Sequence, residues 1–412
     1  MKFASLSTAL VLVGIATALP SGLQRRCERP SNTTVLPEPT ETMSIPPTED
    51  PAPMPTAAPL PPPSSDGGSG ANVFGGSNLY YVAGTNSDQR KYLFGAMQDA
   101  NMKVLRVWLD SQKNGFTKGT PIRDIPDLET SIGQWDDTVL NWMDEVMLDA
   151  HAYGIKLLIS MHSNNALYRP DVYANAFGGP DGFYTRQDAQ EAFDNRLRHV
   201  MDHVHTSLGK KWSELSEYIF AFEAQNEAMI GLGQEYIQSH QEWQCDRAKT
   251  IRSALNGNTG ILVTTGGASW VDESIQDGWL NCPELDIVAL HAYGQGDFDT
   301  GKLQGVVQRA QNAGKRLMMQ EWGVCYYQTD KNQNCDSGPA DGNRGANVAQ
   351  WAAQIQAAGL SWLYWQVLPN ADPHWGGDFE IGVGEPGWEE LKQASRDARS
   401  LLGAFDFSGF IL

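Results

Sequence analysis

The sequence predicts an α/β protein, a single (β/α)8 TIM barrel, on three observations. Short apolar stretches that resemble strands alternate with helix-like segments from about residue 72 to the end of the chain. Most of these strand-like stretches are apolar throughout, which is typical of a parallel sheet covered on both faces. Polar residues stand where several of the stretches end, and a barrel of this kind places its chemistry at the carboxyl ends of its strands.

The first seventy residues are expected to lie outside this domain. Lys2 followed by the apolar run 6–18 is typical of a cleaved secretory signal peptide, assigned to residues 1–19. Residues 20–70 are rich in Pro, Thr, Ser and Gly, so they are interpreted as a pro-segment and a disordered linker. This segment includes the N-glycosylation sequon that begins at Asn32. The barrel domain then spans 71–412, and the protein is expected to be secreted.

Eight strands are expected, each from a run of apolar or β-branched residues. In chain order they are 78–82, 103–109, 155–162, 219–227, 261–265, 286–293, 316–321 and 360–366. Helices are expected where apolar residues recur at helical spacing, and several end at a glycine. They are 87–100, 139–150, 186–208, 234–255, 301–313, 345–358 and 388–402. An open doubly wound sheet is the alternative, but no Gly-x-Gly-x-x-Gly motif follows the first strand.

The formal net charge of −19 argues against nucleic acid or an anionic membrane as a partner. The apolar tail 405–412 is too short for a membrane anchor and is expected to pack on the barrel. An acidic, soluble, secreted protein is expected, and it is expected to be a monomer.

Five cysteines occur, and one of them, Cys27, lies in the tail. The other four allow three pairings. Cys325 and Cys335 would close a short loop, so we favour that bridge together with Cys245–Cys282. An oxidising compartment accounts for this usage, and no Cys-x-x-Cys spacing indicates a zinc site.

Two of the expected strands end in a glutamate. The stretch 219–227 is apolar up to Phe222 and closes with Asn226 and Glu227, while the stretch from residue 316 closes with Glu321. The two glutamates are about three strand-helix units apart, at roughly thirty residues for each unit. Two carboxylates at strand ends of one barrel are what the hydrolysis of a glycosidic bond requires.

Further polar or aromatic residues stand at or near the ends of other strands. Taken singly, each has a structural explanation, such as a satisfied core histidine or a packed ring. Together, and in chain order, they form one candidate site around the glutamates. They are Arg106, His162, Asn226, His291, Tyr293 and Trp365.

This ordered set resembles the pattern of glycoside hydrolase family 5, in clan A, over essentially the whole domain. Asn78-x-Tyr80-Tyr81 and the Leu105-Arg106-Val107-Trp108 strand are similar to secreted endo-β-1,4-mannanases and their relatives. The resemblance implies hydrolysis of a β-linked plant polysaccharide with retention of configuration, with β-1,4-mannan as the first candidate. The expected partner is therefore a polysaccharide substrate. It implies Glu227 as acid/base and Glu321 as nucleophile.

The resemblance also implies a role for each supporting residue. Arg106 and Tyr293 would hold Glu321 ionised and oriented, and His291 would tune the proton of Glu227. Asn226 would contact the sugar's 2-hydroxyl, while His162 and Trp365 would line the sugar site.

Thirteen tryptophans are many for this chain, and several fall in expected loops at the active face. Trp365, Trp270 and Trp375 are our candidates for flat platforms under sugar rings. No metal and no cofactor are expected. An endo-β-glucanase or a β-galactanase on the same scaffold is the alternative within enzymes. A carbohydrate-binding wall protein is the alternative from another class, and the intact pair of glutamates argues against it.

Overall fold

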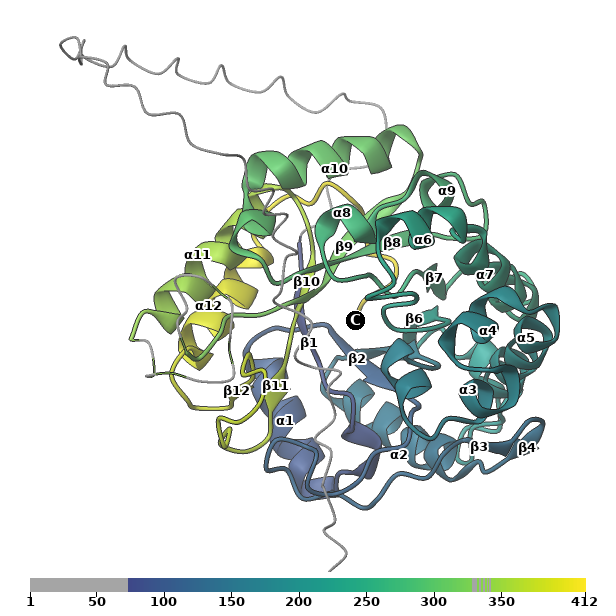
Figure 1. The fold of residues 1–412 in the computed structure, drawn as a ribbon. Coiled ribbons are helices and arrows are strands. Elements are labelled where there is room, and N and C mark those ends of the chain that lie inside the picture. Colours follow the sequence, from purple (N-terminus) through teal and green to yellow (C-terminus); the bar gives the residue numbers. More distant parts are fainter. Residues whose placement is uncertain (1–72, 328–331, 333–334, 336–337, 339, 341) are drawn as a thin grey trace, which may run out of the picture.

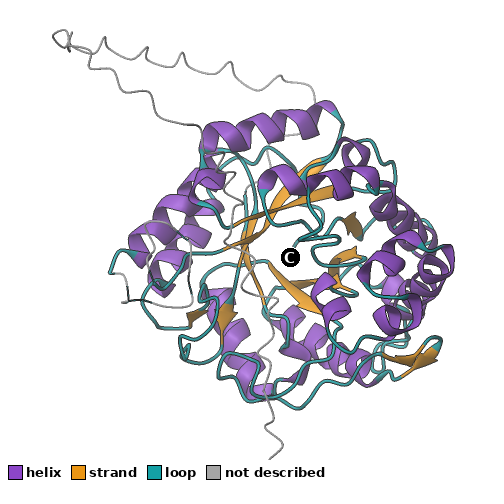
Figure 2. Cartoon of the chain, in the orientation of Figure 1, coloured by secondary structure: helices purple, strands orange, loops and turns teal. Residues whose placement is uncertain are grey.

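The computed structural model describes residues 73–327, 332, 335, 338, 340 and 342–412. Eight parallel strands close into a barrel in the order β1-β10-β9-β8-β7-β6-β5-β2. Helices surround the barrel, as Figures 1 and 2 show. The expected (β/α)8 architecture is therefore confirmed. The signal peptide, linker and sequon predicted within residues 1–72 lie outside the described residues.

The barrel strands are short, and nearly every residue in them is buried. They are β1 (Gly75–Asn78), β2 (Val104–Trp108), β5 (Lys156–Ser160), β6 (Ile219–Glu223), β7 (Leu262–Thr264), β8 (Ile287–Ala292), β9 (Arg316–Trp322) and β10 (Trp362–Tyr364). Two small sheets lie outside the barrel, β3 (Glu129–Ser131) with β4 (Gln134–Trp135) and β11 (Val367–Leu368) with β12 (Ile381–Gly382).

The long helices follow the strands in the alternating order that the sequence predicts. They are α1 (Ser87–Asp99), α2 (Thr138–Ala152), α5 (Gln187–Asp202), α7 (Glu242–Ala254), α10 (Thr300–Asn312), α11 (Arg344–Ala357) and α12 (Trp388–Ala398). Shorter helical segments decorate the loops: α3 (Val172–Phe177), α4 (Pro180–Thr185), α6 (Gln234–Ser239), α8 (Val271–Ser274), α9 (Asp277–Leu280), η1 (Val82–Gly84), η2 (Asn164–Tyr168), η3 (Trp212–Glu214) and η4 (Gln295–Phe298).

The first strand was predicted at 78–82, and this prediction is wrong. The strand is Gly75–Asn78, and the chain then turns into the 3-10 helix at Val82. Glycine is unfavourable in strands by propensity, but here tertiary packing demands it. A Cβ on Gly75 would lie 2.8 Å from the Trp362 ring, and one on Gly76 would lie 2.3 Å from the Val104 carbonyl oxygen.

Three other boundaries differ from the prediction. The helix expected over 186–208 ends at Asp202, after which Val204 pairs with Lys211 in a β-bridge. The helix expected over 234–255 is two helices, α6 and α7. The strand expected over 219–227 ends at Glu223, so Asn226 and Glu227 belong to the following loop.

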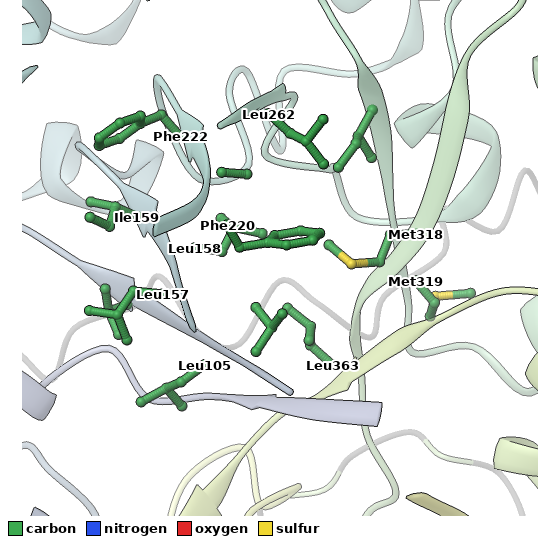
Figure 3. Packing of buried hydrophobic residues seen from close by; sticks show 14 of the residues in the cluster. Leu105, Leu157, Leu158, Ile159, Phe220, Phe222, Leu262, Met318, Met319 and Leu363 are labelled. Atoms are coloured by element: carbon green, nitrogen blue, oxygen red, sulfur yellow. The ribbon is translucent and has the colours of Figure 1, made fainter. Parts of the chain in front are cut away.

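Apolar side chains from the strands fill the barrel and the layer beneath the helices, and Figure 3 shows part of this core. At the amino ends of the strands, the C-terminal tail closes the barrel. Phe407 is 1% exposed and its ring centroid lies 5.7 Å from that of Phe74 and 5.8 Å from that of Phe220. The expected packing of the tail on the barrel is confirmed.

Two disulfides, Cys245–Cys282 and Cys325–Cys335, are the pairs that the sequence favoured. The first ties α7 to the segment after α9, and the second closes the loop that follows β9. Among the described residues, no helix combines the length and apolar character needed to cross a membrane.

Candidate active site

The two glutamates meet at the carboxyl ends of the barrel strands. Glu321 is the penultimate residue of β9, and Glu227 follows β6 by four positions. One carboxylate oxygen from each, together with a ring nitrogen of His291, lie within 4.8 Å of one another. The two carboxylates are 0% and 1% exposed. Glutamates far apart in sequence therefore form one buried pair.

Strand register brings the supporting residues to the same place. Asn78 in β1 is paired with Arg106 in β2, and His291 in β8 is paired with Glu321 in β9. Parallel strands end at the same edge, so side chains at matched register positions face a common centre.

Glu321 is held by donors on both of its oxygens. Arg106 Nη1 donates to Oε1 at 2.7 Å, and Tyr293 Oη donates to Oε2 at 2.7 Å. A cation and a hydroxyl donor on one carboxylate both favour its ionised form. This is the state that a nucleophilic carboxylate needs.

Arg106 is fully buried, and its guanidinium donates to four side chains. Burial would lower the pKa of Arg106, but two neighbouring carboxylates outweigh burial and raise that pKa above its ordinary value. The bonds are Nε to Glu223 at 3.0 Å, Nη2 to Glu223 at 2.6 Å, Nη2 to Asn226 at 2.6 Å, Nη1 to Asn78 at 3.2 Å and Nη1 to Glu321 at 2.7 Å. Five donors in a rigid fork are therefore all used, which fixes the orientation of the group.

Glu227 stands in a sharp turn that is tied to both neighbouring strand ends. Its φ is +50°, in the left-handed region. Glu227 N donates to Gly266 O at 2.9 Å, and Asn226 N donates to His162 O at 2.8 Å. A Cβ on Gly266 would lie 2.0 Å from the Gln225 carbonyl oxygen, so only glycine permits this approach. The turn directs the carboxylate to His291, whose Nδ1 lies 3.1 Å from Glu227 Oε1.

His162 is 2% exposed, and both of its ring nitrogens contact protein groups. Nε2 lies 3.1 Å from Asp171 Oδ2, and Nδ1 lies 3.0 Å from Gln225 Nε2. Burial raises the pKa of Asp171, but the hydrogen bond from His162 and its charge outweigh burial and lower it. His162 therefore contacts the loop that carries Asn226 through its ring and through its backbone carbonyl.

The three candidate tryptophans occupy different positions. Trp365 is partly buried, stacked on Tyr80 with centroids 5.8 Å apart and the rings 6° from parallel. Trp365 and Trp270 both pack against a small cluster that contains Tyr293, whose hydroxyl donates to Glu321. Trp375 is 41% exposed in the loop between β11 and β12, with Lys118 Nζ 5.0 Å from its ring centroid.

Two buried residues that the sequence reasoning gave no role belong to this site. Glu223 shares Arg106 with Glu321, and Gln320 Nε2 donates to Glu223 Oε2 at 2.7 Å. Gln320 Oε1 in turn lies 3.1 Å from His291 Nε2. The sequence did contain a signal for Glu223, because it is an acid at the end of an otherwise apolar strand and a fully buried carboxylate requires a partner.

A pair of carboxylates at the carboxyl ends of the strands of a (β/α)8 barrel, one bound by an arginine and a tyrosine and one facing an imidazole, is typical of a glycoside hydrolase. The family model described as "Cellulase (glycosyl hydrolase family 5)" matches residues 65–371. The chain therefore belongs to glycosyl hydrolase family 5, and it is a glycoside hydrolase.

Similar curated proteins include the probable mannan endo-1,4-beta-mannosidase A of Aspergillus oryzae, 27% identical over 341 residues, covering 78% of this chain and 81% of that protein. Mannan endo-1,4-beta-mannosidase A of Aspergillus aculeatus is 24% identical over 349 residues, covering 79% and 82%. Among solved structures, the endo-1,4-beta-mannanase of Rhizomucor miehei aligns with a TM-score of 0.60 at 18% identity, covering 81% of this chain and 98% of that chain. This structural likeness shows the fold.

Proposed function

We propose that the protein is a secreted endo-β-1,4-mannanase that retains configuration at the anomeric carbon, with Glu227 as acid/base and Glu321 as nucleophile. The observation that carries the proposal is the closeness of the two glutamates, since a carboxylate oxygen of one lies within 4.8 Å of a carboxylate oxygen of the other. Retaining enzymes place their carboxyl groups about 5–5.5 Å apart, whereas inverting enzymes leave about 6.5–9.5 Å for a water molecule.

In the first step, Glu321 attacks the anomeric carbon while Glu227 gives its proton to the departing oxygen. Arg106 and Tyr293 keep Glu321 ionised and aim its lone pairs until the bond to the sugar forms. Asn226, held by Arg106 at 2.6 Å, is placed to accept a hydrogen bond or donate one to the 2-hydroxyl.

In the second step, a water molecule displaces Glu321 from the sugar. Glu227, now a carboxylate, accepts a proton from this water and returns to its starting state. His291 Nδ1, 3.1 Å from Glu227 Oε1, is the ring nitrogen that faces this carboxyl group. Glu321 regains its charge in this step, and the donors from Arg106 and Tyr293 stabilise it as it leaves.

Mannan is the proposed substrate because curated relatives named as mannan endo-1,4-beta-mannosidases align over most of this chain. Trp365 and Trp270, which pack against the cluster that contains Tyr293, would stack on successive sugar rings, and Trp375 would extend this surface. A β-glucanase or β-galactanase activity would use the same two carboxylates, so only the substrate separates these alternatives.

A substrate panel of mannan, β-glucan, xylan and galactan tests the proposal. We expect mannan to be cleaved internally, giving oligosaccharides whose newly formed anomeric centre is β when followed by NMR during the reaction. Cleavage of another glycan alone would reject mannan, and an α product would reject retention.

Glu321→Gln tests the mechanism and separates an enzyme from a carbohydrate-binding protein. The variant should lose turnover while it still binds mannan, because the amide keeps the shape of the side chain and loses its nucleophilicity. Glu389→Gln, on the exposed side of α12, is the matched control. Unchanged turnover in Glu321→Gln would contradict the assignment of the nucleophile.

A further inference from the structure

A continuous path of buried hydrogen bonds joins the two glutamates, and two of its members, Glu223 and Gln320, have no part in the proposed mechanism. Every member is 0% or 1% exposed. Such a path can determine which atom of each group carries hydrogen, because a buried donor needs an acceptor and a buried acceptor needs a donor. From one glutamate to the other, its members are Glu321, Arg106, Glu223, Gln320, His291 and Glu227.

Glu223 enters this path as an acceptor. Arg106 donates to both of its oxygens, at 3.0 Å from Nε and 2.6 Å from Nη2. A carboxylate bound in this way has no hydrogen to give, so a further neighbour has to donate to it. Gln320 Nε2 lies 2.7 Å from Glu223 Oε2. The amide NH2 of Gln320 therefore faces Glu223.

The orientation of Gln320 then decides the tautomer of His291. With its NH2 group toward Glu223, Gln320 turns its carbonyl oxygen to His291 Nε2, 3.1 Å away. A carbonyl oxygen only accepts, so Nε2 carries hydrogen. The other ring nitrogen, Nδ1, lies 3.1 Å from Glu227 Oε1 and 3.5 Å from Glu321 Oε2, so Glu227 is its nearer carboxylate neighbour. The one proton in that contact is shared between Nδ1 and the candidate acid.

The backbone at Gly267 prevents the His291 ring from rotating so that its two nitrogens exchange places. Gly267 has φ +68°, and a Cβ at this position would lie 2.2 Å from His291 Cδ2. The ring thus lies directly against the main chain of the β7–β8 loop. A rotation that exchanged its two nitrogens would have to displace that backbone.

A β-bulge in β9 explains how two consecutive residues, Gln320 and Glu321, both belong to the buried hydrogen-bond path. Leu290 pairs with Met319 and His291 with Glu321, so Gln320 is the extra residue opposite β8. Successive side chains of a regular strand point to opposite faces, but a bulge redirects them. Gln320 and Glu321 can therefore both reach the buried centre.

We propose that Glu223 and Gln320 are positioning residues that hold His291 in the Nε2–H form, so that Nδ1 is always the nitrogen that shares the proton of Glu227. Without the Glu223 carboxylate, Gln320 could turn its NH2 to Nε2. Nδ1 would then carry hydrogen and donate to Glu227, which favours the ionised state of Glu227 and weakens it as an acid. The inference rests on the proposed role of Glu227, but its main readout needs no substrate.

The test is ¹⁵N NMR of the full chain labelled at histidine, with the His291 signals identified by their loss in His291→Gln. Wild type should show a protonated Nε2. Gln320→Leu, which removes the acceptor, should show a mixture of tautomers or an Nδ1–H form. In the same variant, kcat should fall by about tenfold or more, part of the roughly 10²–10⁴ that a positioned acid contributes, with a shifted pH profile and little change in KM.

Two further variants keep the test decisive if Gln320→Leu folds poorly. In Gln320→Glu, the carboxyl group can accept from His291 Nε2 whether or not it is protonated, so the Nε2–H form should be kept, while the second carboxylate beside Glu223 should shift the pH profile. Glu223→Gln should give a mixture of His291 tautomers or an Nδ1–H form, as expected for Gln320→Leu. Gln356→Leu, another buried amide whose Nε2 donates to Ala394 O at 2.8 Å, should leave both readouts unchanged.

An Nδ1–H tautomer in wild type would overturn the inference. So would an unchanged tautomer and pH profile in Gln320→Leu and Glu223→Gln together. Failure of the proposed function shows itself separately, as an absence of glycan cleavage by wild type while its His291 signals still report Nε2–H.

Discussion

Replacement of Tyr293 by phenylalanine removes one oxygen atom from the pocket that holds Glu321. The hydroxyl donates to Glu321 Oε2 at 2.7 Å, and the ring packs on Phe379 with centroids 4.7 Å apart, a contact that phenylalanine keeps. A hydrogen bond to a charged group contributes about 1.5–3 kcal/mol. Because about 1.4 kcal/mol corresponds to a factor of ten, the expected effect on rate is roughly ten- to hundred-fold.

This loss should fall mainly on the second chemical step. In the proposed mechanism, Glu321 loses its charge when it bonds to the sugar and regains the charge when the sugar leaves. The hydroxyl of Tyr293 stabilises the returning charge, so Tyr293→Phe should slow the release of the sugar and let the glycosyl-enzyme accumulate.

An aryl β-mannoside with a good leaving group provides the assay, since its phenolate is released in the first step. Tyr293→Phe should give a rapid burst of phenolate, stoichiometric with enzyme, and then a slow steady rate. Tyr81→Phe is the control, a buried tyrosine whose hydroxyl lies 2.8 Å from Thr120 Oγ1 and not against a carboxylate. A Tyr293→Phe enzyme with the wild-type kcat and no burst would refute the reasoning.

Two further predictions concern stability and substrate binding. Burial raises the pKa of Asp144, but hydrogen bonds from His203, Thr206 and Trp212 outweigh burial and lower it. Asp144→Asn should therefore reduce the free energy of unfolding by about 2–3 kcal/mol at neutral pH. The deficit should shrink as pH falls below the ordinary value of 3.8 and through the lowered folded-state pKa, because wild type then loses the same contribution. Denaturant unfolding of wild type and Asp144→Asn at neutral and at acidic pH measures the loss of stability and its pH dependence. An equal loss at the two pH values would contradict the pKa argument. Lys118 Nζ donates to Trp375 O at 2.5 Å and lies 2.9 Å from Glu380 Oε2, so Lys118→Met should release the Trp375 loop. We expect KM for polymeric mannan to rise several-fold while kcat on a short aryl mannoside stays near wild type; equal effects on both substrates would contradict a role for Trp375 in chain binding.

The sequence predicted the candidate pair of glutamates because their signal is local. Glu227 and Glu321 each close an apolar stretch, and such stretches are recognised without knowledge of their neighbours. The boundaries failed where packing overrode propensity. Gly75 and Gly76 form a strand by pairing with β10 and β2, and both positions are glycine because the Trp362 ring and the Val104 carbonyl leave no room for a Cβ.

The hydrogen-bond path between the glutamates could not be predicted in the same way. Glu223 and Gln320 are 97 positions apart, and their contact depends on closure of the barrel. The bulge at Gln320 is a second reason, because strict alternation would place its side chain opposite to that of Glu321.

The sequence by itself indicated the eightfold alternation of strands and helices and the two acids that follow or close apolar stretches, and it favoured the two cysteine pairs. Periodicity and composition within short windows carry that information. The tertiary structure alone decided which groups share Arg106, how Gln320 is turned and which nitrogen of His291 faces Glu227. These depend on strand register and on hydrogen-bond partners from distant strands, which exist only once the barrel has closed.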